Sequence, residues 1–146
     1  MMGFSTTLWE WYGQDEYKRV VAVCEAIPAL EFLALTSDMQ QETIPECPAC
    51  EAWSGMILPL SEVLSICGSV LPEEIKTRLQ GIWKRCNSLT EAAFHCHDRL
   101  IFDHDEWQPI RTAAIELLDL MDSLAIKPFL DDLLLDCINL TRGIKR

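Results

Sequence analysis

Residues 75–100 read IKTRLQGIWKRCNSLTEAAFHCHDRL and contain the strongest periodicity in the chain. Their apolar side chains recur at alternating steps of four and three residues, at Ile75, Leu79, Ile82, Cys86, Leu89, Ala93, Cys96 and Leu100. An average step of about 3.5 residues is typical of a buried helical stripe. Pro72 precedes the run, at a position where a proline starts a helix. The pattern predicts one long helix over about 73–102, with Asn87 and Ser88 as the one place where it would break.

Helical spacing continues on both sides of this run. Four further apolar stripes begin at Tyr17, Trp53, Trp107 and Leu130. Pro28 ends the first stripe, Pro59 should kink or split the second, and Pro128 separates the third from the fourth. Strand-like alternation does not occur at useful length in the sequence. We therefore predict an all-α fold, a compact bundle of five to seven helices around the long helix, with 1–146 as a single domain and the main loop at 36–50.

The composition is that of a folded globule. A chain of 146 residues can bury one core, and a content of 49% hydrophobic and 24% charged residues excludes wholesale disorder. Charged residues interrupt every apolar stretch well before the roughly 20 residues that span a bilayer. The first residues lack the basic start and the long apolar run of a secretory signal. We predict a cytoplasmic protein, in which the 7 cysteines stay reduced.

The net charge excludes proteins whose function is to bind phosphate groups over a basic surface. The chain has 23 acidic and 12 basic residues, a net charge of -11. This excludes a uniformly basic nucleic-acid binder and a polybasic membrane binder, because both need cationic side chains that meet phosphate. Residues 20–75 lack Lys and Arg and carry -9, residues 76–99 carry +3, and residues 100–141 carry -7. The acidic blocks indicate either compensation within the fold or an acidic face for a basic partner.

An acidic face would consist of carboxylates whose mutual repulsion a cationic partner relieves. The candidates are Glu42, Glu46, Glu116, Asp119, Asp122, Asp131, Asp132 and Asp136. Trp9, Trp11 and Tyr12 crowd the N-terminal segment and could either join the binding surface or cap the chain's own core. The partner would be a basic toxin, nuclease or nucleic-acid-binding protein. The leading hypothesis is a small acidic protein that inhibits such a partner by stoichiometric binding, as immunity proteins, antitoxins and phage-type inhibitors such as anti-CRISPR proteins do.

The segment Cys47-Pro48-Ala49-Cys50 has the spacing of metal ligands. A zinc site needs two more ligands, for which His95, His97 and His104 are candidates, although adjacent residues of a long helix cannot grip one ion together. A thioredoxin-type redox site would need neighbouring strands. The other cysteines fall on apolar stripes, at Cys24, Cys67, Cys86, Cys96 and Cys137. A free thiol there acts as a small hydrophobe, so we expect reduced thiols without a metal or cofactor and keep a zinc-stabilised helical module as an alternative.

The sequence contains no recognisable catalytic motif. It lacks a nucleophile elbow, a glycine-rich phosphate loop and an H-E-x-x-H pair, and its 6 glycines leave little material for a phosphate cradle. His104 between Asp103 and Asp105 is more typical of a turn into a helix than of an acid–base pair. We therefore predict a protein without enzymatic activity. A further alternative is a helical homodimer with a structural or adaptor role, in which the stripe of the long helix lies between subunits.

Overall fold

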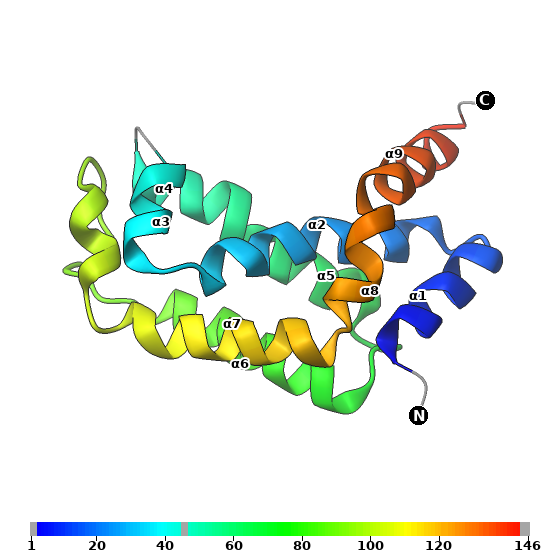
Figure 1. Ribbon diagram of the computed structural model, residues 1–146, viewed down its shortest axis with the longest axis horizontal. Helices are drawn as coiled ribbons and strands as arrows, with labels where there is room; N and C mark the ends of the chain where they lie inside the picture. Colours follow the sequence, from blue (N-terminus) through cyan, green and yellow to red (C-terminus); the bar gives the residue numbers. More distant parts are fainter. Residues whose placement is uncertain (1–2, 45–46, 144–146) are drawn as a thin grey trace.

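The computed structural model describes residues 3–44 and 47–143, which fold into packed helices without a strand among them (Figure 1). The α-helices are α1 (Phe4–Gly13), α2 (Tyr17–Ala34), α3 (Ser37–Thr43), α4 (Pro48–Glu51), α5 (Leu58–Cys67), α6 (Glu73–Asn87), α7 (Trp107–Leu120), α8 (Ser123–Ile126) and α9 (Leu130–Thr141). Between them lie the π-helix η1 (Ala52–Ile57) and the 3-10 helices η2 (Arg99–Asp103) and η3 (Lys127–Phe129). Helices α4 and α8 have only four residues each, and the described residues form seven longer α-helices. This confirms the predicted all-α bundle.

Helix α2 lies at the centre of the bundle. It packs along α5, α7 and α9 and also meets α1 (Figure 1). Buried residues occur all around its 18-residue length, as expected for a helix surrounded by neighbours. The prediction that the bundle surrounds residues 73–102 is therefore wrong. The stripe also does not end at Pro28, because α2 continues to Ala34 and the burial of Leu30 and Leu33 compensates the roughly 3 kcal/mol cost of an internal proline.

The predicted long helix ends halfway along its stripe. Helix α6 begins directly after Pro72, as predicted, but it stops at Asn87. The Asn87 side-chain amide donates to the Trp83 carbonyl at 2.8 Å, and the Ser88 hydroxyl donates to the Lys84 carbonyl at 2.8 Å. Such bonds satisfy carbonyls at a helix end and compete with continuation of the helix. The break predicted as a possibility at Asn87 and Ser88 is thus the real end of the helix.

After α6 the chain doubles back as an irregular loop, residues 88–98. Ala93 is fully buried, and its carbonyl accepts a hydrogen bond of 2.9 Å from the Trp107 indole N–H. The Phe94 ring lies 6.4 Å from Trp53 and 6.2 Å from Trp107 between ring centroids. These contacts fasten the loop to η1 and α7. The loop is held by packing with other segments rather than by helical hydrogen bonds.

Two regions that the sequence predicts to be irregular have a defined secondary structure. Pro59 lies in the first turn of α5, directly after the π-helix η1, so the predicted interruption of this stripe is confirmed. The predicted loop at 36–50 is only partly a loop, because it contains α3 and α4. The Thr36 hydroxyl caps α3 by accepting a bond of 3.3 Å from the Met39 N–H. Gln40 of α3 is fully buried and accepts two hydrogen bonds from the Arg111 guanidinium of α7.

The apolar stripe that begins at Trp107 extends beyond the helix that contains it. Helix α7 ends at Leu120, and the chain turns at Asp122, whose φ of 58° is left-handed. Leu124 continues the helical spacing of this stripe in the sequence, but its side chain is 83% exposed. Gly143 follows α9 with a left-handed φ of 72°, the conformation in which a glycine commonly ends a helix. Each helix within residues 3–44 and 47–143 is too short or too polar to cross a lipid bilayer.

Candidate functional site

The predicted acidic residues do not form one face. Glu42 lies on α3, at the opposite end of the molecule from α8 and α9 (Figure 1). Glu46 lies outside the described residues. The other candidates lie between α7 and α9, and four of them are exposed: Glu116, Asp119, Asp131 and Asp132. The single predicted face is therefore not formed, because Glu42 lies far from the candidates on α7 and α9.

Three of the predicted carboxylates bind partners within the fold. Asp136 is buried and accepts a hydrogen bond from the Tyr12 hydroxyl. Asp122 accepts one of 2.6 Å from the Ser5 hydroxyl, and Glu116 forms an ion pair of 3.0 Å with Arg78 of α6. Among these three, the Glu116 pair compensates charge within the chain, as one interpretation of the charge pattern predicts, whereas Asp122 and Asp136 are held by neutral hydroxyl groups.

The predicted aromatic residues divide between core and surface. Trp11 is buried against Phe4, with the guanidinium carbon of Arg19 5.7 Å from its ring centroid. Trp9 is 41% exposed and meets Phe129 edge to face at 5.6 Å between ring centroids. Tyr12 is half-buried and packs edge to face against Trp9 at 6.0 Å. All three lie on α1, which sequence reasoning had left without secondary structure.

Trp9 and Tyr12 line a hollow of about 170 Å³ between α1 and α9. We call it the aromatic–acidic cleft, and its lining consists of Trp9, Tyr12, Phe129, Asp132, Leu133 and Asp136. Two predicted aromatic and two predicted acidic residues thus meet here, although more than a hundred positions separate them in the chain. Phe129, which the sequence analysis did not select, is 50% exposed beside them. Its position directly after Pro128 and before two aspartates was the one signal that could have indicated it.

Three cysteines gather at the other end of the molecule. The sulfur atoms of Cys47, Cys50 and Cys96 all lie within 4.8 Å of one another, and those of Cys50 and Cys96 are 3.6 Å apart. Cys47 and Cys50 flank the start of α4, and Cys96 lies in the 88–98 loop. The prediction that Cys96 is a small hydrophobe on a helical stripe is wrong, because the helix has ended and its side chain is exposed. The prediction for Cys24, Cys67, Cys86 and Cys137 is confirmed, since all four are buried.

Hydrogen bonds between the thiols separate their acidities. The backbone N–H of Cys50, followed by its thiol and the backbone N–H of His97, lowers the pKa of Cys47 to about 7. The hydrogen bond between the Cys50 and Cys47 thiols, followed by the one between the Cys50 and Cys96 thiols, raises the pKa of Cys50 to about 12. A sulfur that accepts several hydrogen bonds is stabilised as a thiolate. The cluster therefore presents one activated sulfur beside two neighbouring thiols.

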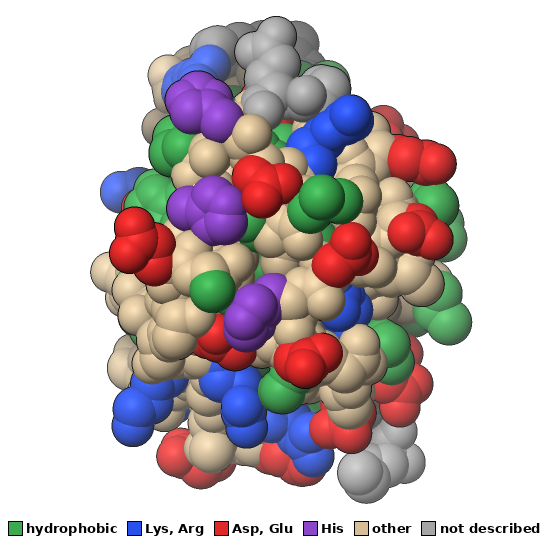
Figure 2. Space-filling view, turned by 90° about the vertical axis from the view of Figure 1, so that its left-hand side faces the viewer, with side chains coloured by type: hydrophobic (Ala, Val, Ile, Leu, Met, Phe, Trp, Pro, Cys, Tyr) green, Lys and Arg blue, Asp and Glu red, His purple; other side chains and the backbone are tan. Residues whose placement is uncertain are grey.

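Two of the three histidines that were candidate zinc ligands make other contacts. His95 uses one ring nitrogen on the Glu91 carbonyl at 2.7 Å and the other on the Asp98 carboxylate at 3.2 Å. His104 accepts a bond of 3.1 Å from the Glu106 N–H at the entry to α7, which supports its interpretation as a turn residue. All three histidine side chains lie on the end of the molecule seen in Figure 2, among acidic and basic groups. The structure thus places Cys96, not a histidine, beside Cys47 and Cys50.

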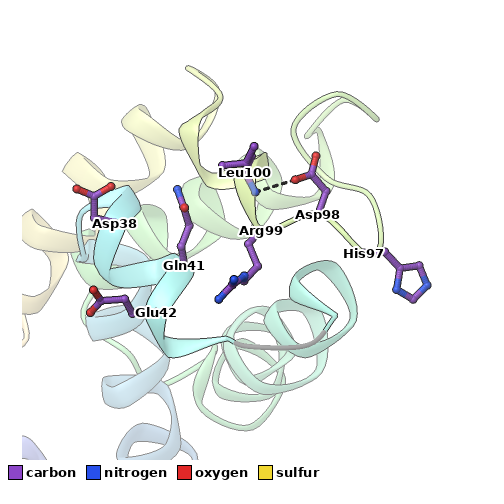
Figure 3. Close-up of a pocket in the computed structure, with 7 residues that line it drawn as sticks. All are labelled: Asp38, Gln41, Glu42, His97, Asp98, Arg99 and Leu100. Atoms are coloured by element: carbon purple, nitrogen blue, oxygen red, sulfur yellow. Dashed lines mark hydrogen bonds between the residues drawn. The ribbon is translucent and has the colours of Figure 1, made fainter.

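A polar cleft of about 620 Å³ separates the Cys96 loop from α3 (Figure 3). Its lining is Asp38, Gln41, Glu42, His97, Asp98, Arg99 and Leu100. Arg99 extends into the cleft, whereas the His97 ring points away from it (Figure 3). The Asp98 carboxylate accepts a bond of 2.9 Å from the Leu100 N–H and caps η2. This cleft mixes charges of both signs and brings only Glu42 from the predicted set.

Known proteins were compared with the chain at three levels. No family model, no curated protein and no solved structure matches it.

Proposed function

We propose that this cytoplasmic protein binds a basic protein stoichiometrically and inhibits it, and that the aromatic–acidic cleft is the contact surface. The partner would be a toxin, a nuclease or another nucleic-acid-binding protein, so the chain would act as an immunity protein, an antitoxin or a phage-type inhibitor does. The observation that carries the proposal is the meeting of the half-exposed Trp9 and Phe129 rings with Asp132 in one hollow. Catalysis has no part in this proposal.

The cleft combines the two groups that protein interfaces use. Exposed aromatic rings bury much apolar area on binding and lose little side-chain entropy, which is why they dominate binding hot spots. Asp132 lines the hollow beside these rings, and Asp131 is exposed in the same first turn of α9. Carboxylates at the rim of an interface attract a cationic partner and select it against acidic ones. The net charge of -11 would accelerate this encounter at low ionic strength.

Below the rim, the cleft is rigid. The Tyr12 hydroxyl donates to the buried Asp136 carboxylate and so connects α1 to α9. Leu133 of the same lining is buried in the core. A surface that is ordered before binding loses less entropy when the partner docks, which favours tight stoichiometric complexes.

Affinity capture from the native host, at low and high salt, tests the proposal with four matched variants. Trp9→Ala and Asp132→Asn alter the cleft. Leu100→Ala and Glu42→Gln remove an exposed apolar residue and an exposed carboxylate at the other end of the molecule. We expect the wild-type chain and both distant variants to retain one basic partner at low salt. Both cleft variants should recover at most about a tenth of it, the effect of losing 1.4 kcal/mol of binding free energy.

Three outcomes contradict the proposal. They are the absence of a basic partner, equal losses from the cleft and distant variants, and binding that does not weaken with salt. A dimeric mass of the pure chain that persists in Trp9→Ala would instead support the homodimer alternative. Far-UV circular dichroism of each variant confirms that the helices persist.

A further inference from the structure

We propose that Cys47, Cys50 and Cys96 bind one Zn²⁺ ion as three thiolates, with the fourth position open to solvent, and that the ion fastens the 88–98 loop to the start of α4. This metal site is independent of the proposed partner binding, since it lies at the opposite end of the molecule. It also differs from the zinc alternative drawn from the sequence, which paired Cys47 and Cys50 with histidines.

The sulfur positions fit a single tetrahedral ion. Zinc binds thiolate sulfur at about 2.3 Å, so two sulfurs on one tetrahedral ion are about 3.8 Å apart. The Cys50 and Cys96 sulfurs are 3.6 Å apart, and none of the three pairs exceeds 4.8 Å. A disulfide would need an S–S distance of about 2.05 Å, and all three cysteines are free. Small side-chain rotations are enough to bring all three sulfurs to bonding distance.

The backbone holds the two segments of the cluster in place. The Cys50 and Cys96 sulfurs lie 3.6 Å apart, so the α4 segment and the loop already meet at these atoms. The His95 ring spans the loop from the Glu91 carbonyl to the Asp98 carboxylate. His97 has a left-handed φ of 64°, which turns the chain sharply after Cys96. In known metal sites, hydrogen bonds around the ligands orient them in the same way.

Thiolate sulfur selects the class of ion. Three soft sulfur donors favour Zn²⁺ over Mg²⁺ and Ca²⁺, which require oxygen ligands. Among the described His, Cys, Asp and Glu residues, these three sulfurs are the set of ligand atoms that converges closely enough for one ion. Cys50 and Cys96 are exposed, so water has access to the fourth position. Each cysteine that binds releases its thiol proton to the solvent, and the ion exchanges its own water molecules for sulfur.

Metal content of the full chain tests the assignment. The chain is purified with a non-thiol reductant and without chelator, incubated with Zn²⁺, desalted and analysed by elemental mass spectrometry. We expect one zinc per chain for the wild type, for Cys67→Ala and for His97→Ala. Cys96→Ser should weaken binding by at least the roughly 10- to 100-fold that changes around a metal site cost. Cys67 is the matched control because its thiol is buried on α5, away from the cluster.

Two further readouts test the geometry without relying on variants that fold poorly. Co²⁺ bound to the wild type should show the sulfur-to-cobalt charge-transfer band and the visible bands of a tetrahedral site. Zn²⁺ should also slow hydrogen exchange in residues 88–98 but not in α9. Zinc well below one per reduced chain, or a cobalt spectrum without sulfur bands, overturns the site. Loss of zinc from His97→Ala overturns the open fourth position, and unchanged exchange in the loop overturns its fastening role.

Discussion

Residues 73–87 and residues 88–100 carry the same apolar stripe, yet only the first segment is an α-helix. In α6 the stripe is buried, as at Leu79 and Ile82. In the second segment Ala93 is buried, but Leu100 is 63% exposed. A period of about 3.5 residues therefore describes what a segment would bury as a helix, and does not decide whether a helix forms there. The difference lies in the competing contacts, which are local at Asn87 and Ser88 and tertiary at Trp107.

The largest expected effect comes from removing the tertiary contact that holds the loop. Trp107 is fully buried, and its indole donates to the Ala93 carbonyl at 2.9 Å. Trp107→Ala should lower the free energy of unfolding by about 3–5 kcal/mol, because it leaves a cavity and an unpaired carbonyl. Denaturant unfolding measures the change. Trp107→Phe is the control, since it keeps an aromatic ring and should cost about 1–3 kcal/mol. A loss below about 1 kcal/mol for Trp107→Ala would show that another contact holds the loop.

A second pair of variants compares the two halves of the stripe directly. Ile82 is fully buried in α6, whereas Leu100 is exposed on η2. Ile82→Ala should therefore cost about 2–5 kcal/mol of unfolding free energy. Leu100→Ala should change it by no more than about 0.5 kcal/mol. Thermal or denaturant unfolding of both variants provides the measurement, and similar losses would mean that the stripe acts as one unit.

A smaller effect is expected from the local signals at the end of α6. The double variant Asn87→Ala, Ser88→Ala removes two side-chain bonds to helix carbonyls and introduces two strong helix formers. These changes oppose each other, so we expect stability to change by no more than about 1 kcal/mol. Far-UV circular dichroism should show no added helix, because Trp107 still holds the loop. A gain of several helical turns would assign the end of α6 to local sequence instead.

The smallest effect concerns pH and the junction of the loop with α7. The Thr90 hydroxyl, followed by its N–H, hydrogen-bonds the Glu106 carboxylate and holds the pKa of Glu106 below its usual value. A lowered carboxyl pKa stabilises the fold above the pKa of the unfolded chain, and this stabilisation is lost as the pH falls through the folded pKa. Thr90→Val should therefore flatten the decline in unfolding free energy as the pH falls through and below the ordinary pKa of a glutamate. Equal pH profiles for the variant and the wild type would exclude this contribution.

Much of the fold was predictable from the sequence because apolar spacing and prolines act locally. The helices that include Tyr17, Ile75, Trp107 and Leu130 lie where their stripes indicate, and Pro59 interrupts the second stripe as expected. The errors all concern the positions where helices end. Helix ends depend on competing bonds, as at Asn87, and on burial that outweighs proline, as at Pro28 in α2. Neither is visible in periodicity.

The candidate sites were predictable only as residue types. The spacing of Cys47 and Cys50 indicates a possible metal site. Cys96 falls on a helical stripe in the sequence, and only the reversal of the chain in the 88–98 loop brings it beside Cys47 and Cys50. Trp9 and Asp132 were selected separately, and only the packing of α1 against the C-terminal segment places them in one cleft. Contacts between segments far apart in sequence depend on the path of the chain, which a single sequence does not reveal.

The sequence by itself determined the all-α class, the excess of acidic residues and the number of cysteines, because composition and local spacing do not depend on tertiary contacts. The tertiary structure alone decided that α2 is central, that the stripe of residues 75–100 breaks after α6, and that three thiols converge. The physical reason is that burial and metal-ligand geometry are properties of pairs and triplets of residues. Such sets are defined only after the chain has folded back on itself.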